Sequence, residues 1–153
     1  MEIGIIRVTG EKEIRELFDG FIYDFYELCK IPRDELERYL KKIVKNADVY
    51  VAYVKKKPVG IISFYCNDEK NKYGYLTNFA IKEKYRGKGI GSLLLEILET
   101  QCKKKGIEKV GLEVNINNHV AIGIYKKRGF KEVEYRGGKV IYMVKNLKEL
   151  ENM

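Results

Sequence analysis

The sequence predicts a mixed α/β domain, and three observations support this class. Segments with apolar residues at three- and four-residue steps alternate with runs of β-branched and aromatic residues, so helices and strands follow one another along the chain. A glycine-rich turn joins one of these strands to an apolar helix. The 153 residues, 45% of them hydrophobic, suffice for one core without disulfides or metals. We therefore expect a single domain over residues 1–153.

The first half of the chain is predicted to form a strand, two helices and a hairpin. Short alternation marks the strand, helical periodicity marks the helices, and a lysine-rich turn at residues 55–58 joins the two strands of the hairpin. Gly20 is a point where the first helix could divide. The expected bounds are 3–8 for the strand, 11–28 and 32–44 for the helices, and 47–54 and 59–66 for the hairpin strands.

The second half is predicted to alternate strands with two helices and to end in a hairpin. Glycines mark three boundaries, because a residue without Cβ suits the left-handed position after a helix and the tight turn of a hairpin. These glycines are Gly106 and Gly129 after the helices, and Gly137-Gly138 in the turn. The expected strands are 73–81, 109–114, 130–135 and 140–144, and the helices follow residue 89 and residue 117.

Lysine and arginine outnumber acidic residues by 30 to 22, which gives a formal net charge of +8. Such a surplus favours anionic partners, among them nucleic acids and phosphorylated cofactors. The basic residues are scattered over several predicted helices and loops, and no recognised nucleic-acid-binding motif is present. We therefore expect no specific nucleic-acid partner.

The cysteines and the apolar runs bear on the compartment. Cys29, Cys66 and Cys102 are odd in number and lack C-x-x-C spacing, so we expect buried free thiols, with no disulfide framework and no metal site. The N-terminal residues do not resemble a signal peptide, and the apolar runs fall far short of the ~18 residues that suggest a membrane span. We expect a cytoplasmic protein with no membrane partner.

The stretch EKYRGKGIGS can hold a phosphate group. A strand, a glycine-rich turn and a helix N-terminus direct free backbone N–H groups toward one point, where the helix dipole also favours negative charge. The spacing fits neither of two widespread phosphate loops. Counted from Gly87, the third glycine of G-x-G-x-x-G and the second glycine of G-x-x-x-x-G-K-[ST] would both fall at position 92, which is Ser92.

The spacing R-x-x-G-x-G, filled by Arg86, Gly89 and Gly91, resembles the signature of the GCN5-related N-acetyltransferase (GNAT) superfamily. A second motif of that family, N-x-x-A-x-x-x-Y-x-K-x-G-F, is matched from Asn118 to Phe130. The resemblance covers most of the chain. It implies a mixed, mostly antiparallel central sheet of six to seven strands, with helices on both faces and a V-shaped splay between two parallel central strands.

The resemblance also implies an activity and a co-substrate. Such a protein moves the acetyl group of acetyl-CoA to a primary amine by direct attack in a ternary complex, without a metal. Strand residues would bind the pantetheine arm, loop residues would bind the pyrophosphate, and two residues of the later helix would complete the site. These cofactor residues are Phe79, Ala80, Ile81, Arg86, Gly87, Lys88, Gly89, Ile90, Gly91, Ser92, Asn118 and Tyr125.

Two residues are candidates for proton transfer. The resemblance places Tyr125 beside the sulfur of departing CoA, as hydrogen-bond donor or general acid, although a tyrosine on an amphipathic helix also suits a core position. Several branches of the family carry a glutamate on the strand before the loop, but YLTNFAI at residues 75–81 has no carboxylate. Glu113 on the next strand is a candidate base, acting through water, or else a salt-bridged strand residue.

The acceptor side is the least defined. In resembling proteins the first helices and the final hairpin form its walls, which makes Tyr23 and Tyr26 candidate substrate contacts. Because the strand before the loop has no carboxylate, only a weak base is expected, and a weak base favours an acceptor amine of low pKa. The acceptor could still be a protein N-terminus, a lysine, a polyamine, an amino acid or an antibiotic. A non-catalytic acyl-CoA sensor or interaction module on the same fold is the alternative function. A homodimer through the final hairpin also stays open.

Overall fold

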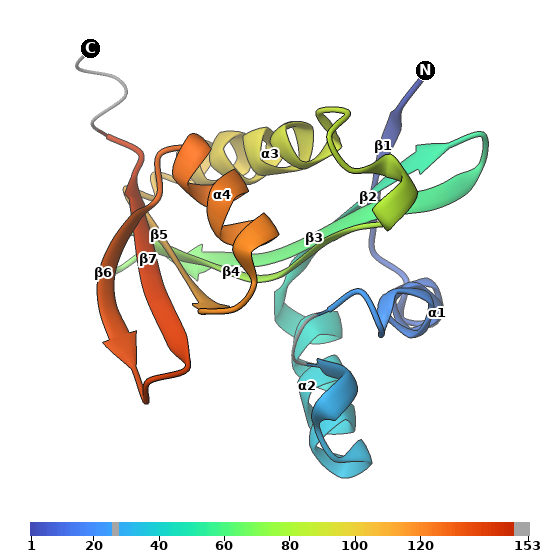
Figure 1. The fold of residues 1–153 in the computed structure, drawn as a ribbon, viewed down its shortest axis with the longest axis horizontal. Coiled ribbons are helices and arrows are strands. Elements are labelled where there is room, and N and C mark those ends of the chain that lie inside the picture. The colour runs from blue at the N-terminus through green and yellow to red at the C-terminus, as the bar shows by residue number, and fades with distance from the viewer. Residues whose placement is uncertain (26–27, 149–153) are drawn as a thin grey trace.

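The computed structural model describes residues 1–25 and 28–148, which form a seven-stranded sheet with helices on both faces (Figure 1). The strand order is β1-β2-β3-β4-β5-β7-β6, and within the described residues every neighbouring pair is antiparallel except β4 and β5. The strands are β1 Gly4–Val8, β2 Asp48–Val54, β3 Lys57–Asp68, β4 Tyr73–Ile81, β5 Lys109–Asn115, β6 Lys131–Arg136 and β7 Val140–Asn146. The predicted fold class is confirmed.

The helices form a layer on each side of the sheet. The α-helices are α1 Glu11–Phe21, α2 Arg33–Asn46, α3 Ile90–Lys104 and α4 His119–Lys127, with 3₁₀ turns at Leu28–Lys30 and Glu83–Tyr85. In Figure 1, α3 and α4 lie above the sheet and α1 and α2 lie below it. Separate groups of buried side chains fill the two layers, with Leu94 and Leu98 in the first and Phe18 and Ile43 in the second.

The parallel pair in the centre of the sheet separates after four residues. Tyr73–Leu76 of β4 pair with Lys109–Leu112 of β5, and the two strands then diverge. Beyond this point β4 stays paired with β3, and β5 stays paired with β7. An extra residue in β4 marks the divergence, because Ser63 faces Asn78 and Phe64 faces Leu76, which leaves Thr77 as a bulge. A bulge bends its strand, so the expected splay begins where β4 turns away from β5.

Turn chemistry explains the hairpins at both ends of the sheet. Lys55 and Lys56 have φ angles of 50° and 67°, and Gly137 and Gly138 have 59° and 69°. Two consecutive residues with positive φ match the twist of paired strands, as in a type I′ turn. The lysine pair adopts this conformation with Cβ atoms present, whereas the glycine pair does so without steric cost.

The first predicted helix is too long. The sequence predicts a helix over 11–28, but α1 ends at Phe21, and the amides of Asp24 and Phe25 both donate to the carbonyl oxygen of Phe21. Phe25 and Leu28 are nevertheless buried in the same layer as α1. Apolar spacing therefore reported burial correctly at these positions, but it did not distinguish a helix from a turn that packs on the same core.

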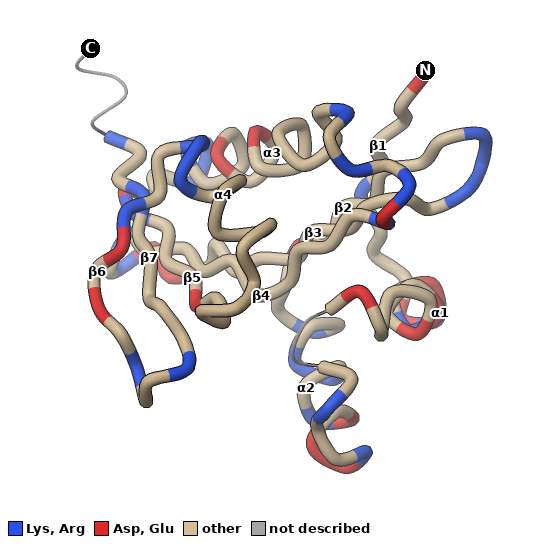
Figure 2. The backbone as a smooth tube through the Cα atoms, viewed as in Figure 1, with Lys and Arg blue, Asp and Glu red and all other residues tan. Residues whose placement is uncertain are grey.

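A buried ionic cluster fixes α4 against α3 and the sheet. Glu99 of α3 accepts from Lys145 of β7 at 2.6 Å and from Arg128, just after α4, at 2.8 Å. Most other charged residues lie on the outer sides of the helices and in turns (Figure 2). Removing one member of a buried ion pair leaves an uncompensated charge, so this cluster holds the C-terminal end of α4 in one place.

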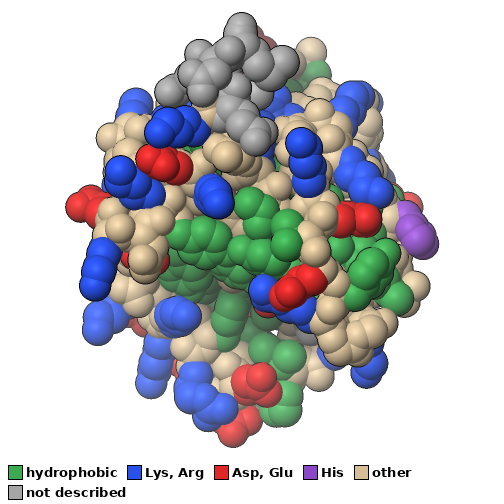
Figure 3. Space-filling view, turned by 90° about the vertical axis from the view of Figure 1, so that its left-hand side faces the viewer, with side chains coloured by type: hydrophobic (Ala, Val, Ile, Leu, Met, Phe, Trp, Pro, Cys, Tyr) green, Lys and Arg blue, Asp and Glu red, His purple; other side chains and the backbone are tan. Residues whose placement is uncertain are grey.

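The far edge of the sheet is open. All six residues of β6 are exposed, and Val133 and Tyr135 keep 58% and 67% of their surface. Figure 3 views the molecule from this side and shows an apolar area bordered by lysine and arginine side chains. An unpaired edge strand can add a further strand, so this edge is the place where a second copy could pair.

The cysteine prediction holds for two residues of three. Cys66 and Cys102 are buried, but Cys29 is exposed because it lies in the 3₁₀ turn after α1. All three are free thiols. In the described part of the chain, the helices are too short or too polar to cross a membrane, and no cluster of three His, Cys, Asp or Glu side chains could hold a metal ion.

Candidate active site

The turn before α3 presents a row of unpaired backbone amides. Gly87 and Gly89 have φ angles of 74° and 85°, which turn the chain sharply into the helix. The first amide bonded inside α3 is that of Leu93, which donates to the carbonyl of Gly89 at 3.1 Å. Within the described residues, the amides of 87–92 have no protein acceptor. Amides arranged in this way, at the positive end of the helix dipole, can bind an anion, and we call this turn the anion site.

Two further contacts fix the turn against β4. The Arg86 side chain donates from Nε to the carbonyl oxygen of Ile81 at 3.1 Å, so it ties the turn to the last residue of the strand. Gly91 packs closely on the strand as well, because a Cβ there would lie 3.1 Å from the Phe79 ring. A side chain at position 91 would therefore press on the Phe79 ring, so glycine allows the helix to approach the strand closely.

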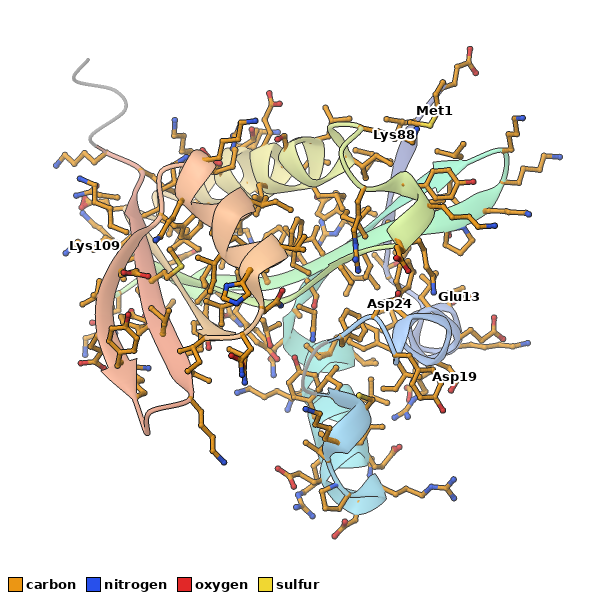
Figure 4. All side chains as sticks on the ribbon, in the orientation of Figure 1. Met1, Glu13, Asp19, Asp24, Lys88 and Lys109 are labelled. Carbon is orange, nitrogen blue, oxygen red and sulfur yellow. The ribbon has the colours of Figure 1, made fainter. Side chains whose placement is uncertain are left out.

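A cavity of about 490 Å³ lies between this turn, the end of β4 and the start of α4. We call it the loop-side cavity. Its walls come from the segment after α1, from β4 and the turn after it, and from α4 with the residues before it. Among them are Tyr23, Asp24, Phe79, Ala80, Ile81, Arg86, Asn118 and His119. Lys82, directly after β4, pairs with Asp24 at 2.6 Å and so holds the segment after α1 against the end of β4. Asp24 is labelled in Figure 4.

Asn118 directly precedes α4 and caps it. Its Oδ1 accepts a hydrogen bond from the amide of Ala121 at 3.2 Å, which is the geometry of a helix N-cap. Asn118 also lines the loop-side cavity, so capping and ligand contact are compatible. His119 is exposed and lines the same cavity.

A second cavity, of about 260 Å³, lies in the splay between β4 and β5 and opens toward α2. We call it the α2-side cavity. Phe79 and Asn118 line both cavities, so the two are adjacent. The other walls come from five separate parts of the chain and include Phe25, Leu28, Tyr39, Thr77, Asn78, Glu113, Val114, Asn115 and Tyr125.

Tyr125 is buried between aromatic rings and reaches the α2-side cavity. Its ring lies 5.7 Å from those of Phe79 and Phe130, and 6% of its surface is exposed. Within the described residues its hydroxyl has no hydrogen-bond partner. Burial, with a smaller contribution from Tyr75, raises the pKa of Tyr125 well above its ordinary value. The phenol therefore stays protonated at neutral pH and is available as a donor.

Glu113 reaches the same cavity from β5 and forms a surface ion pair. Arg136, at the end of β6, donates to Glu113 Oε1 at 3.2 Å and also bonds Glu134. The Arg136 guanidinium lies 4.0 Å from the centre of the Tyr142 ring. An exposed ion pair of this kind contributes about 0.2–1 kcal/mol, so it can be exchanged for another partner at little cost. Both readings of Glu113, base and ion-pair member, are compatible with this geometry.

The predicted cofactor residues are not all placed alike. Phe79, Ala80, Ile81, Arg86 and Asn118 line the loop-side cavity, whereas Gly87, Gly89, Gly91 and Ser92 offer backbone amides. The side chain of Ile90 is buried in the core, so only its amide faces outward.

Two predicted contacts lie elsewhere, and a third cannot be placed. Lys88 lines a separate hollow on the other side of the turn, beside Met1 (Figure 4). Tyr23 is 90% exposed and borders the loop-side cavity, not the α2-side cavity. Tyr26 falls outside the described residues.

Sequence reasoning missed a polar network at the bulge. The Tyr39 hydroxyl of α2 bonds the Thr77 side chain and donates to Asn78 Oδ1 at 2.9 Å, and Ser63 Oγ of β3 also donates to Asn78 Oδ1. These contacts hold the bent part of β4 and stabilise the splay. The available signal was the polar pair Thr77-Asn78 inside an otherwise apolar and aromatic strand.

Comparison with known proteins confirms the family resemblance that the motifs indicate. Residues 12–130 match the model of the acetyltransferase (GNAT) family. An uncharacterized N-acetyltransferase of Methanocaldococcus jannaschii is 33% identical over 123 residues, which cover 76% of this chain and 53% of that protein. An N-alpha-acetyltransferase of Sulfurisphaera tokodaii is 39% identical over 79 residues, 48% of this chain and 47% of that protein.

The fold has close solved counterparts. The PaiA N-acetyltransferase of Thermoplasma acidophilum, crystallised with coenzyme A, superposes with a TM-score of 0.74 over 95% of this chain and 99% of its own, at 21% identity. In three curated relatives, the part that matches this chain makes up between 37% and 53% of the relative's length, which is about half or less. The family model, in contrast, matches most of the chain, and its matched segment contains the splayed strands, the turn before α3 and α4. The chain belongs to the acetyltransferase (GNAT) family.

Proposed function

We propose that this protein is an N-acetyltransferase that moves the acetyl group of acetyl-CoA to a primary amine within a ternary complex. The observation that carries the proposal is the row of unpaired amides at 87–92 beside a cavity that follows the unpaired edge of β4. A hydrogen bond to a charged group contributes about 1.5–3 kcal/mol, so a few converging amides suffice for micromolar affinity. Family membership supports the same activity.

The residues of the two cavities fit the co-substrate. The amides of 87–92 would bind the pyrophosphate, and the edge of β4 from Thr77 to Ala80 offers strand-type hydrogen bonds to the pantetheine arm. The carbonyl of Ile81 already accepts from Arg86, so Ile81 contributes less than predicted. Acetyl-CoA supplies the activated acyl thioester, and the splay brings its reactive end next to the α2-side cavity.

Protein groups near the reacting end are suited to two proton movements. Tyr125 keeps its proton and can donate a hydrogen bond to the departing sulfur, although its raised pKa disfavours full transfer. On the other side, Glu113 can accept the proton that the attacking amine must lose, directly or through water. The amine nitrogen would form its bond to the acyl carbon as the carbon–sulfur bond breaks. The nitrogen would lose one proton to Glu113 or to water, and the departing thiolate would take up one proton from solvent to leave as the free CoA thiol.

Among acceptors, we place α-amines first. An α-amine titrates near pH 8 and a lysine side chain near 10.4, so an α-amine loses its proton to a weak base more easily. The name of the Sulfurisphaera relative points to the same kind of acceptor. We further propose a single cytoplasmic domain over residues 1–153, with pairing through β6 as the route to a dimer.

Turnover with a mixed amine panel tests the proposal. Release of free CoA thiol from acetyl-CoA, detected with a thiol reagent, is expected only when an amine is present, and acetylated product should appear by mass spectrometry. Calorimetric binding of acetyl-CoA without product from any amine would instead support the sensor alternative. Absence of binding would remove both.

A further inference from the structure

Asn78 carries a buried donor that the protein does not use. Its surface is 6% exposed, and it lines the α2-side cavity. Its Oδ1 accepts from two hydroxyls, those of Tyr39 and Ser63. The amide nitrogen on the other branch of this planar group has no acceptor within the described residues. The only buried side-chain polar atom left fully enclosed and unpaired in that part of the chain is the Tyr65 hydroxyl, so the Asn78 nitrogen retains contact with the cavity.

The two hydroxyls hold this group in one orientation. Tyr39 comes from α2 and Ser63 from β3, and both elements are fixed by the core on either side of β4. A donor placed in this way is ready to bind a ligand without reorganisation. Leaving a buried N–H without a partner lowers a binding constant by a factor of roughly 5 to 150 relative to a complex in which it is paired. A ligand with an acceptor atom at this point therefore gains affinity.

The face of the sheet on which the Asn78 side chain lies indicates which ligand it would contact. Asn78 pairs in register with Ser63 on β3, and the alternate residue Ala80 packs in the core layer of α1 and α2. Phe79 and Tyr125, in contrast, contact the layer of α3 and α4, where the turn at 87–92 also lies. Asn78 thus faces the side opposite the anion site, from which the acceptor would enter the splay.

We propose that Asn78 Nδ2 donates a hydrogen bond to a carbonyl oxygen next to the acceptor amine, which makes Asn78 a specificity-determining residue for α-aminoacyl acceptors. Peptide N-termini and amino-acid amides carry such a carbonyl one carbon away from the amine. Alkyl amines, polyamines and lysine side chains do not, and they would leave the buried donor unpaired. Sites of this type reject an analogue that lacks the bonded group far more strongly than apolar pockets reject a missing methylene. The inference rests on the proposed acetyl transfer.

The test compares two acceptors of equal shape. Alaninamide and 1,2-dimethylpropylamine differ in the carboxamide that replaces an isopropyl group. Asn78→Asp keeps an oxygen for Tyr39 and Ser63 and replaces the nitrogen donor by an oxygen. We expect this variant at pH 8 to lower kcat/KM for alaninamide by about 10- to 100-fold and for the alkyl amine by less than about threefold. Comparing variant with wild type for each amine cancels the difference in amine basicity.

Asn78→Ala provides the second variant and should show the same selective loss, with thermal unfolding of both variants monitored to confirm folding. An equal loss for both amines would overturn the inference, since Asn78 would then act on the acyl group or on the fold. Unchanged or higher activity of Asn78→Asp with alaninamide would also overturn it, because the amide oxygen would then face the cavity.

If wild-type protein turns over no amine, the proposed activity fails separately. Calorimetric titration of both amines onto the CoA-bound protein then decides the inference. A preference for alaninamide that Asn78→Asp removes supports it, and equal binding of the two amines overturns it.

Discussion

The two cavities of this protein are built in different ways. The anion site of the loop-side cavity comes from six consecutive residues, 87–92, and uses backbone amides. The α2-side cavity collects side chains from the segment after α1, from α2, β4, β5 and α4. The positions of the backbone amides depend on local conformation alone, whereas the positions of side chains from five parts of the chain depend on the whole fold. The first cavity is therefore sensitive to glycine substitutions and the second to single polar atoms.

This contrast predicts a separation of effects. Changes in the turn at 87–92 should weaken co-substrate binding equally for every acceptor. Changes around the α2-side cavity should alter turnover or acceptor binding and leave CoA affinity nearly constant. A variant that changes both CoA affinity and acceptor turnover would show that the two cavities are energetically coupled. Phe79 and Asn118 line both cavities and could carry such coupling.

The largest effect is expected from Gly89→Val. Gly89 has a φ of 85°, a region that β-branched residues avoid, so valine should force the turn to rearrange and move the amides apart. Losing two charge-assisted bonds corresponds to about 3–6 kcal/mol, so the Kd for CoA should rise at least ~100-fold by calorimetry. Gly4→Val is the matched control, because Gly4 lies in an edge strand with open space around it. Comparable losses in both variants would contradict the assignment.

Glu113→Gln should lower kcat by about 100-fold if Glu113 accepts the proton of the amine, the size of effect typical of a general base. CoA affinity should not change. Arg136→Gln is the paired variant, since it breaks the same ion pair from the other side and removes no base. We expect it to change kcat by less than about threefold, in line with the small contribution of an exposed pair. Equal losses from the two variants would assign Glu113 to the ion pair alone.

Tyr125→Phe should lower kcat by about 10- to 50-fold and change the Kd of CoA by less than about threefold, because the hydroxyl acts on the departing sulfur. Equal loss in both quantities would assign Tyr125 to binding in general. The raised pKa of Tyr125 adds a pH test. Activity should not decline between pH 9 and about pH 10 through loss of this proton, since the buried phenol keeps it there.

The same shift predicts how stability depends on pH. The folded state holds the Tyr125 proton at pH values where the unfolded chain, with a pKa of about 10, releases it. The stabilising contribution is therefore complete below pH 10 and is lost as pH rises toward the folded pKa. The free energy of unfolding in urea should fall more steeply above pH 10 in the wild type than in Tyr125→Phe. Identical slopes would indicate that the hydroxyl is solvated.

Sequence reasoning predicted the locally encoded region well. The strand 73–81, the glycine-rich turn and the helix after it all follow from local sequence patterns, and the structure has them at the expected residues. The same reasoning overextended α1, because burial at Phe25 and Leu28 continues after the helix has ended. The motif did not predict where the side chains of Ile90 and Lys88 point. The Ile90 side chain is buried in the core and the Lys88 side chain lines a separate hollow, so only their backbone amides face the proposed phosphate site.

The polar network at the α2-side cavity was not predictable for a related reason. Tyr39, Ser63 and Asn78 are separated by 24 and 15 positions, and they meet only because α2 packs under the bulge in β4. Hydrophobic periodicity carries information on which face of an element is buried. It carries none on which polar atoms of three distant elements will converge.

Tyr39→Phe gives the smallest and most selective effect. It removes one of the two hydroxyls that orient Asn78 and leaves Ser63 and the aromatic ring in place. Loss of one neutral hydrogen bond costs about 0.5–1.5 kcal/mol, which corresponds to a rise in acceptor KM of roughly 3- to 10-fold. CoA affinity should stay constant, since Tyr39 lines only the α2-side cavity of the two. A weaker CoA affinity with unchanged acceptor KM would mean that the bulge sets the width of the splay for the pantetheine arm, and the two regions would then act as one.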